Sequence, residues 1–82
     1  MNEIDLRWKN IGNEELKDLC QIKFKELKKL YLGGNNISDI KVLEKVKFDK
    51  LEILDLGNNQ ILKKDNNSII SKLKIKIKKF YI

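Results

Sequence analysis

The chain has 82 residues, of which 41% are apolar and 37% are charged, and its formal net charge is +6; this is the composition of one small folded domain rather than of a disordered segment. No apolar run approaches the roughly 20 residues that a membrane-spanning helix needs, and the chain opens with acidic residues, so neither membrane insertion nor secretion is expected. The single cysteine, Cys20, excludes an intramolecular disulfide and fits a cytoplasmic or nuclear location.

Residues 1–26 form the first and least regular of several similar units. Ile4-Asp-Leu6 alternates apolar and polar residues with period two, which predicts a strand with one buried face. Asn13, followed by two glutamates, marks the start of a helical return. Lys9 stands where later units have an asparagine, and Asn10 is displaced by one, so this turn is expected to differ from the others. The apolar positions of the return are Leu16, Leu19, Ile22 and Phe24.

Residues 27–50 carry the pattern in full, as Leu-x-x-Leu-x-Leu-x-x-Asn-x-Ile. Leu30-Tyr-Leu32 predicts a short strand, and Asn35 follows where the chain must turn away from the sheet. Burying the asparagine amide without partners would cost roughly 2–7 kcal/mol. We therefore expect it to hydrogen-bond backbone groups of adjacent stacked turns.

The period lengthens after this turn. Ile37-x-x-Ile40-x-x-Leu43 places apolar residues on one face of a helix or of a tighter helical turn, and Ser38 and Asp39 suit its N-cap and first turn. Phe48 is expected to fill the gap before the next strand. Each unit is thus a strand plus a helical return, and its apolar face is buried only when neighbouring units stack on it.

Residues 51–72 repeat this pattern. All five pattern positions return after 24 residues, in the segment 51–61. Leu54-Asp-Leu56 predicts the next strand, parallel to the preceding one, and Asn59 predicts its turn. Such regularity indicates equivalent residues stacked in successive coils.

The last part of the chain is predicted to be a short helical stretch and a closing strand. The helical stretch is expected to begin at Asn67 or Ser68. Leu73-Lys-Ile75-Lys-Ile77-Lys then alternates strictly, which predicts a strand at about residues 73–82 with lysines on its solvent face. Charge on that face would oppose the addition of a further strand.

The leucine and asparagine pattern resembles that of the leucine-rich-repeat family. The run Ile37-x-x-Ile40-x-x-Leu43-x-x-Val46-x-Phe48 is similar to the convex side of the short intracellular type, found in phosphatase-regulatory and splicing-factor members. The resemblance covers nearly the whole chain and is clearest over residues 24–61. It implies an α/β solenoid, a short segment of a right-handed horseshoe, with parallel strands on the concave face and short helices or helical turns on the convex face. The implied single domain spans residues 1–82 and divides into units 1–26, 27–50 and 51–72 and a closing strand at about 73–82.

In this architecture the side chains between the pattern leucines point out of the sheet, where a partner protein or peptide would bind. Tyr31 and Trp8 are the expected anchors, because aromatic residues with a polar tip dominate binding hot spots. The alternatives are that Trp8 covers the open end of the core or packs under the first turn, and that Tyr31 is merely exposed. One predicted row across the sheet is Asp5, Tyr31, Asp55 and Lys76. The predicted partner-binding residues are Asp5, Arg7, Trp8, Lys29, Tyr31, Ile53, Asp55, Lys74 and Lys76.

The basic end of the chain supports a second hypothesis. Residues 63–82 hold seven lysines against Asp65, whereas the charges of residues 1–62 cancel. Several lysines favour electrostatic binding of nucleic acid or of an anionic membrane. This segment has no arginine, however, and its aromatic residues are confined to Phe80 and Tyr81, so a solvated strand is the simpler interpretation. A third hypothesis is a homo-oligomer formed by end-to-end stacking, because the core is small.

No residue is assigned to catalysis, to a cofactor or to a metal. The chain has no histidine and no glycine-rich nucleotide loop, and no base is evident for Cys20. Asp65-Asn-Asn lacks the glycine and the final glutamate of a calcium loop. The sequence therefore predicts a binding module rather than an enzyme, with no small-molecule substrate.

Overall fold

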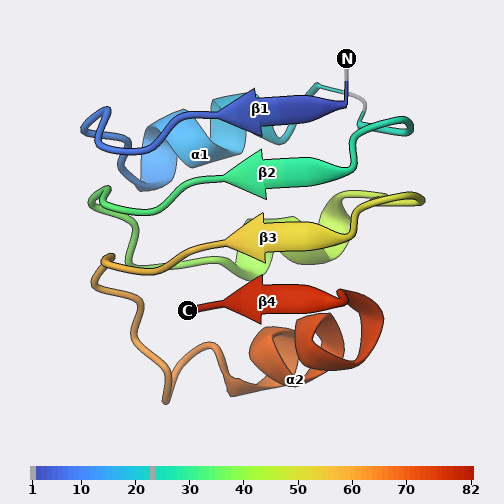
Figure 1. Ribbon diagram of the computed structural model, residues 1–82. Helices are drawn as coiled ribbons and strands as arrows, with labels where there is room; N and C mark the ends of the chain where they lie inside the picture. Colours follow the sequence, from blue (N-terminus) through green and yellow to red (C-terminus); the bar gives the residue numbers. More distant parts are fainter. Residues whose placement is uncertain (1, 23) are drawn as a thin grey trace.

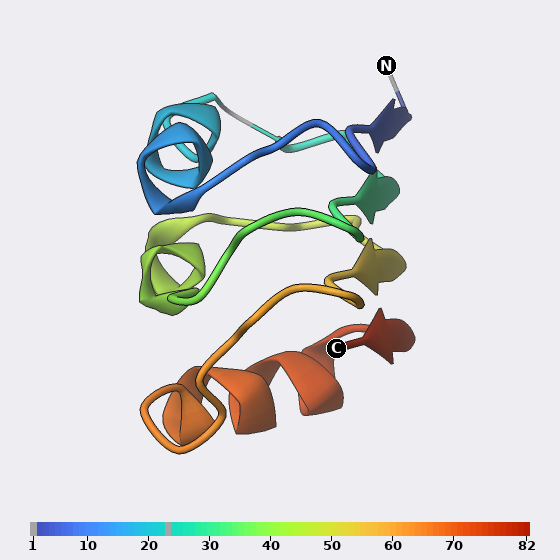
Figure 2. The same cartoon turned by 90° about the vertical axis from the view of Figure 1, so that its left-hand side faces the viewer.

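The computed structural model describes residues 2–22 and 24–82, in which strands and helical segments alternate (Figure 1). The described strands form one parallel sheet in the order β1-β2-β3-β4. Seen from the side, the sheet lies on one face of the molecule and the helical returns lie on the other, which confirms the predicted α/β repeat fold (Figure 2). The elements are β1 (Glu3–Asp5), α1 (Asn13–Leu19), β2 (Lys29–Tyr31), the 3-10 helix η1 (Lys41–Lys45), β3 (Ile53–Asp55), α2 (Asn67–Lys76) and β4 (Lys79–Tyr81).

Equivalent residues of successive units pair in register across the sheet. Ile4 is opposite Leu30, Leu30 is opposite Leu54, and Leu54 is opposite Phe80. The predicted spacing of 24 residues holds between β2 and β3, and the two leucines are fully buried. Equivalent side chains therefore stack in columns, and each unit covers the apolar face of its neighbour.

The helical returns differ from unit to unit. α1 begins at Asn13 as predicted, and the backbone N–H of Gly12 at its N-cap donates to Glu15 Oε1 at 2.7 Å. The middle return, η1, is a 3-10 helix whose N-cap is Ile40, one residue after the predicted Ser38 and Asp39. The backbone N–H of Lys41, its first residue, donates to Asp39 Oδ1 at 2.9 Å. The third return, α2, is α-helical. Both kinds of return that the sequence allowed are thus present in one chain.

The segment predicted as a closing strand is instead the end of α2 followed by the short strand β4. Leu73 and Ile77 are buried, whereas Ile75 between them is 89% exposed. A strand would place all three on one face, but a helix buries residues four apart and turns the middle one outward. The prediction of a strand over residues 73–82 was therefore wrong for its first part, and the third unit extends beyond residue 72.

β4 follows the same strand pattern as the earlier units, with isoleucine or phenylalanine in place of the three leucines. Ile77-Lys-Lys-Phe80-Tyr-Ile82 has the spacing Leu-x-x-Leu-x-Leu of the two preceding strands. Phe80 takes the position equivalent to Leu54, and the backbone N–H of Leu56 donates to the carbonyl oxygen of Tyr81 at 2.7 Å. The spacing of the pattern positions, rather than the alternation of lysines, determines where this strand begins.

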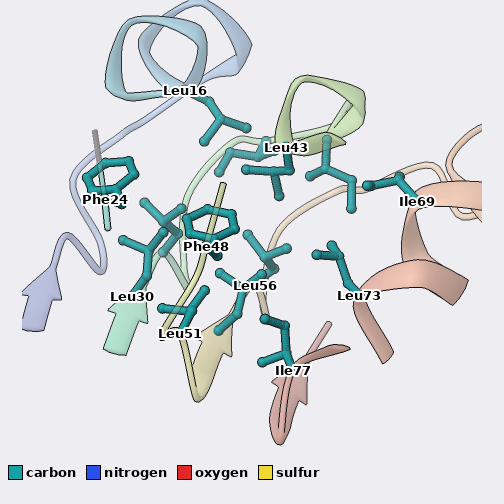
Figure 3. Packing of buried hydrophobic residues seen from close by; sticks show 14 of the residues in the cluster. Leu16, Phe24, Leu30, Leu43, Phe48, Leu51, Leu56, Ile69, Leu73 and Ile77 are labelled. Carbon is teal, nitrogen blue, oxygen red and sulfur yellow. The ribbon is translucent and has the colours of Figure 1, made fainter. Parts of the chain in front are cut away.

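The core lies between the sheet and the helical returns and is built from leucine, isoleucine and phenylalanine side chains (Figure 3). Phe24 and Phe48 precede β2 and β3 and stack on each other, with ring centroids 6.0 Å apart. Both rings are buried, so Phe48 fills the gap before the next strand as predicted. The stack keeps the units in line on the side where the strands begin.

Candidate functional site

Asn35 closes the turn after β2 by bonding two units at once. Its side chain is 2% exposed, and its Oδ1 accepts the backbone N–H groups of Lys9 and Ile11 at 3.0 and 2.9 Å. Its Nδ2 donates to the carbonyl oxygens of Leu6 and Leu32 at 3.0 and 2.9 Å. The predicted asparagine ladder is therefore present. The lysine at position 9 does not disturb it, because Lys9 contributes a backbone group.

Asn59 repeats this arrangement one unit later. Its Oδ1 accepts the backbone N–H of Ile37 at 2.9 Å, and its Nδ2 donates to the carbonyl oxygens of Leu32 and Leu56 at 3.0 and 3.1 Å. Across residues 2–22 and 24–82, no buried side-chain nitrogen or oxygen lacks a hydrogen-bond partner. The amides of Asn35 and Asn59 therefore join the turns that follow β1, β2 and β3, next to the outward side chains of the sheet.

A second pair of asparagines, whose role between units the sequence analysis missed, links the helical returns. Asn13 Oδ1 accepts the backbone N–H groups of Ser38 and Asp39 at 3.0 and 3.1 Å. Asn66 approaches from the opposite side, and its Oδ1 accepts the backbone N–H of Ile40 at 3.0 Å. Asn13 follows the isoleucine of its unit by two residues and Asn66 follows it by five. The two occupy different pattern positions, so comparing the units with one another does not reveal them.

The sheet face is the outward surface of the strands, which is the concave face of the predicted horseshoe. Register across the sheet sorts its side chains into rows. The first row is Glu3, Lys29, Ile53 and Lys79. The second row is Asp5, Tyr31, Asp55 and Tyr81. The third row, just after the strands, is Arg7, Gly33 and Gly57. The predicted site residues Asp5, Arg7, Lys29, Tyr31, Ile53 and Asp55 are therefore together on one surface.

Two predicted site residues are not on the sheet face. Lys74 and Lys76 lie on α2, because that segment is helical rather than extended. The second row accordingly ends in Tyr81 and not in the predicted Lys76. Lys79 and Tyr81 are the sheet-face residues that the sequence analysis missed as members of the rows. The spacing Ile77-x-x-Phe80-x-Ile82 is the signal that locates them.

Arg7 connects two strands of the sheet face. Its Nε and Nη2 donate to the two carboxylate oxygens of Asp5 at 2.9 and 2.6 Å. Its guanidinium also lies over the ring of Tyr31, 4.7 Å from the ring centroid. Hydrogen bonding by Arg7 lowers the pKa of Asp5 from 3.8 to about 2. The Arg7 guanidinium is thus paired with the Asp5 carboxylate and lies on the face of the Tyr31 ring.

Trp8 follows Arg7 in the left-handed backbone conformation that its equivalents Gly34 and Asn58 also adopt, with φ of 57°, 70° and 53°. Its indole packs on Gly34, since a Cβ at that glycine would lie 2.2 Å from Trp8 Cδ2. Trp8 is nevertheless 71% exposed, so it does not cover the end of the core, which was one alternative to an anchor role. A shallow hollow of about 400 Å³ here is lined by Asp5, Arg7, Trp8 and Lys9.

The lysines of residues 63–82 are distributed over several elements rather than along one strand face. Lys74 and Lys76 are exposed on α2, whereas Lys72 pairs with Glu44 of η1 across to the middle unit. None of the helices in the described part of the chain is long and apolar enough to cross a bilayer. Lys74 and Lys76 therefore lie on a different surface from the sheet face, whereas Lys79 belongs to the first row of that face.

The remaining polar groups offer little for chemistry. Cys20 is half-buried on the helical side, and desolvation by burial raises its pKa to about 11, so the thiol stays protonated at neutral pH and is a poor nucleophile. Among the described residues, three or more metal-ligating side chains do not converge anywhere.

Comparison with known proteins agrees with this geometry. The family model described as leucine-rich repeats (2 copies) matches residues 25–74, which is more than half of the chain. No curated protein and no solved structure matches the chain. The match does not separate the subtypes of the family, so the short intracellular type stays a prediction. Leucine-rich repeats generally mediate protein–protein interactions and are typically not enzymes. The chain belongs to the leucine-rich-repeat family.

Proposed function

We propose that this chain is a protein-interaction module that binds a partner protein or peptide through its sheet face. The observation that carries the proposal is the patch of Arg7, Tyr31 and Trp8 on that face, flanked by Asp5 and Asp55. Tyrosine, tryptophan and arginine contribute most to binding at protein interfaces. A surface built on hydrogen-bonded turns also loses little conformational entropy when a partner binds.

A double variant, Tyr31→Ala with Asp55→Lys, tests this proposal. We expect the immobilised variant to lose partner proteins that the natural chain captures from a lysate, because the substitutions remove an aromatic anchor and reverse a charge at the centre of the sheet face. Its circular dichroism spectrum should remain that of the folded chain, because neither side chain belongs to the buried core.

The matched control places the same changes on the helical side. Ile22→Ala with Asp18→Lys truncates one large exposed side chain and reverses one acidic charge at or just after α1, with the same change in net charge. This variant should capture the same partners as the natural chain. Capture that survives in the sheet-face variant would exclude this part of the sheet as the binding surface.

The competing proposal is electrostatic attachment to nucleic acid or to an anionic membrane through residues 63–82. It relies on lysines such as Lys74 and Lys76 on α2, away from the sheet face, so it is tested separately. In that case the triple variant Lys74→Gln, Lys76→Gln and Lys78→Gln would remove binding, and affinity would fall steeply between low and physiological salt. We expect neither effect on partner capture. Light scattering on the captured complex shows whether the partner is a second copy of the chain.

A further inference from the structure

The second row of the sheet face contains the same pair of side chains twice. Asp5 on β1 is in register with Tyr31 on β2, and Asp55 on β3 is in register with Tyr81 on β4. Because the sheet is parallel and in register, each aspartate is paired across the sheet with the tyrosine of the following strand. The chain therefore presents two Asp–Tyr pairs in the same backbone register.

The first pair holds a cation supplied by the chain itself. Arg7, two residues after Asp5, donates two side-chain hydrogen bonds to that carboxylate and lies over the Tyr31 ring. This is a favourable arrangement for a planar guanidinium, which can pair with both oxygens of a carboxylate while stacking on an aromatic face. The first pair thus shows which chemical group such an Asp–Tyr arrangement accommodates.

The second pair has a glycine where the first has arginine. Gly57 follows Asp55 by two residues, as Arg7 follows Asp5. The aspartates are held alike, since the Gly57 N–H donates to Asp55 Oδ1 at 2.9 Å and the Arg7 N–H donates to Asp5 Oδ1 at 3.1 Å. Among the salt bridges of the described residues none involves Asp55.

The surroundings of the second pair are open. Tyr81 is 52% exposed. A Cβ on Gly33 would lie 3.0 Å from one oxygen of Asp55, and a Cβ on Gly57 would lie 3.2 Å from the other. Glycine at both positions therefore leaves room for the Asp55 carboxylate and places no side chain over it, so a group from another molecule can approach Asp55 on the face that also carries Tyr81.

We propose that Asp55 and Tyr81 bind an arginine side chain of the partner, whose guanidinium pairs with the Asp55 carboxylate and stacks on the Tyr81 ring as Arg7 does on Tyr31. This inference rests on the proposed function of the sheet face and specifies the chemistry of the partner. Lysine fits the site less well, because its ammonium is a compact charge that neither pairs with both carboxylate oxygens nor stacks as a plane.

The test uses the intact chain labelled with nitrogen-15 and three capped tripeptides, Gly-Arg-Gly, Gly-Lys-Gly and Gly-citrulline-Gly. We expect the arginine peptide to shift the backbone amide signals of Asp55, Gly57 and Tyr81 in a saturable way. The lysine peptide should bind about tenfold more weakly, and the citrulline peptide, which has the same shape without the charge, should cause no saturable shift. Equal responses to the arginine and citrulline peptides would overturn the inference.

Two pairs of variants locate the binding. Asp55→Asn should remove the response to the arginine peptide, and Asp18→Asn, the same change on α1, should keep it. Gly57→Arg should also remove the response, because it supplies the guanidinium from within the chain as Arg7 does for the first pair. Gly57→Ala adds a Cβ without a cation and should keep most of it. Arginine binding by Gly57→Arg as strong as by Gly57→Ala would contradict the proposed site.

The peptide titration and the partner-capture experiment test different claims and can fail independently. If the double variant Tyr31→Ala with Asp55→Lys loses partner capture but the arginine peptide never shifts Asp55 and Tyr81, the sheet face binds a partner by other contacts and this inference alone fails. If the peptide binds as described but partner capture survives in the double variant, Asp55 and Tyr81 bind arginine, but the proposed function of the sheet face fails and the captured partner is not the source of that arginine.

Discussion

Asn35 is the residue on which the stacking of the first two units most depends. Its amide group serves two N–H donors of the first unit and carbonyl oxygens of both units. The amide is shielded from solvent, so removing it would leave these backbone groups unpaired rather than hydrated. A single side chain thereby adds four hydrogen bonds to the two backbone bonds, Trp8 N–H to Gly33 and Asn36 N–H to Ile11, that join these turns.

We expect Asn35→Ala to lower the free energy of unfolding by about 3 kcal/mol, because each orphaned buried group costs about 1–3 kcal/mol. Asn36→Ala is the matched control, since Asn36 is exposed and its amide donates to Asn10 at the surface; its cost should stay within about 0.5 kcal/mol. Urea unfolding followed by circular dichroism measures both variants. Similar losses for Asn35 and Asn36 would contradict the role of the ladder.

The pairing of Asp5 with Arg7 has a pH dependence of known sign. Folding lowers the pKa of the Asp5 carboxyl from 3.8 to about 2, first of all through the Arg7 side-chain hydrogen bonds. A carboxyl of this kind contributes stability above its unfolded pKa and loses it as the pH falls through its folded pKa. The contribution should therefore be complete above pH 3.8 and be lost by pH 2 or so. Carboxyl-carbon NMR should give a midpoint near 2 for Asp5, rising toward 3.8 in Arg7→Gln. A midpoint near 3.8 in both proteins would show that the pair does not persist in solution.

At the scale of elements, β2 and β3 were predictable and the boundary between α2 and β4 was not. Leu30-Tyr-Leu32 and its copy 24 residues later show both alternation and the same spacing to the next asparagine, so two independent features agree. In residues 73–78 apolar residues and lysines alternate, but the asparagine of the repeat does not follow them. A strand period of two and a helical spacing of four both place Leu73 and Ile77 on one face, but only the strand period also places Ile75 there. The lysines between these residues suit a solvated strand as well as a helix.

The burial of α2 gives a direct test of its helical phase. Leu73→Ala should lower the free energy of unfolding by about 3 kcal/mol, because it removes a buried leucine from the core. Ile75→Ala should change it by less than about 0.5 kcal/mol, because that side chain is exposed. Thermal or urea unfolding of the two variants provides the comparison. Similar costs at both positions would favour the extended conformation over the helix.

At the scale of the whole molecule, the repeat determines the rows of the sheet face and leaves the contacts within them open. Lys29, Tyr31, Ile53 and Asp55 could be placed side by side because positions one repeat apart must meet in a parallel, in-register sheet. The pairing of Arg7 with Asp5 depends instead on the rotamers of two exposed side chains. The packing of Trp8 on Gly34 depends on a left-handed turn. Neither feature has a periodic signature, so neither could be predicted from the pattern.

Hydrogen bonds from Asn13 and Asn66 restrict how the middle return can move. η1 is a short 3-10 helix, a conformation with poorer internal hydrogen bonding than an α-helix. The segment that leads into it is nevertheless hydrogen-bonded from both sides, to Asn13 of the first unit and to Asn66 of the third. Moving the middle return outward would require the hydrogen bonds from both flanking units to break. We therefore expect amide hydrogen exchange to be slowest in the middle unit and in the strands that carry Tyr31 and Asp55.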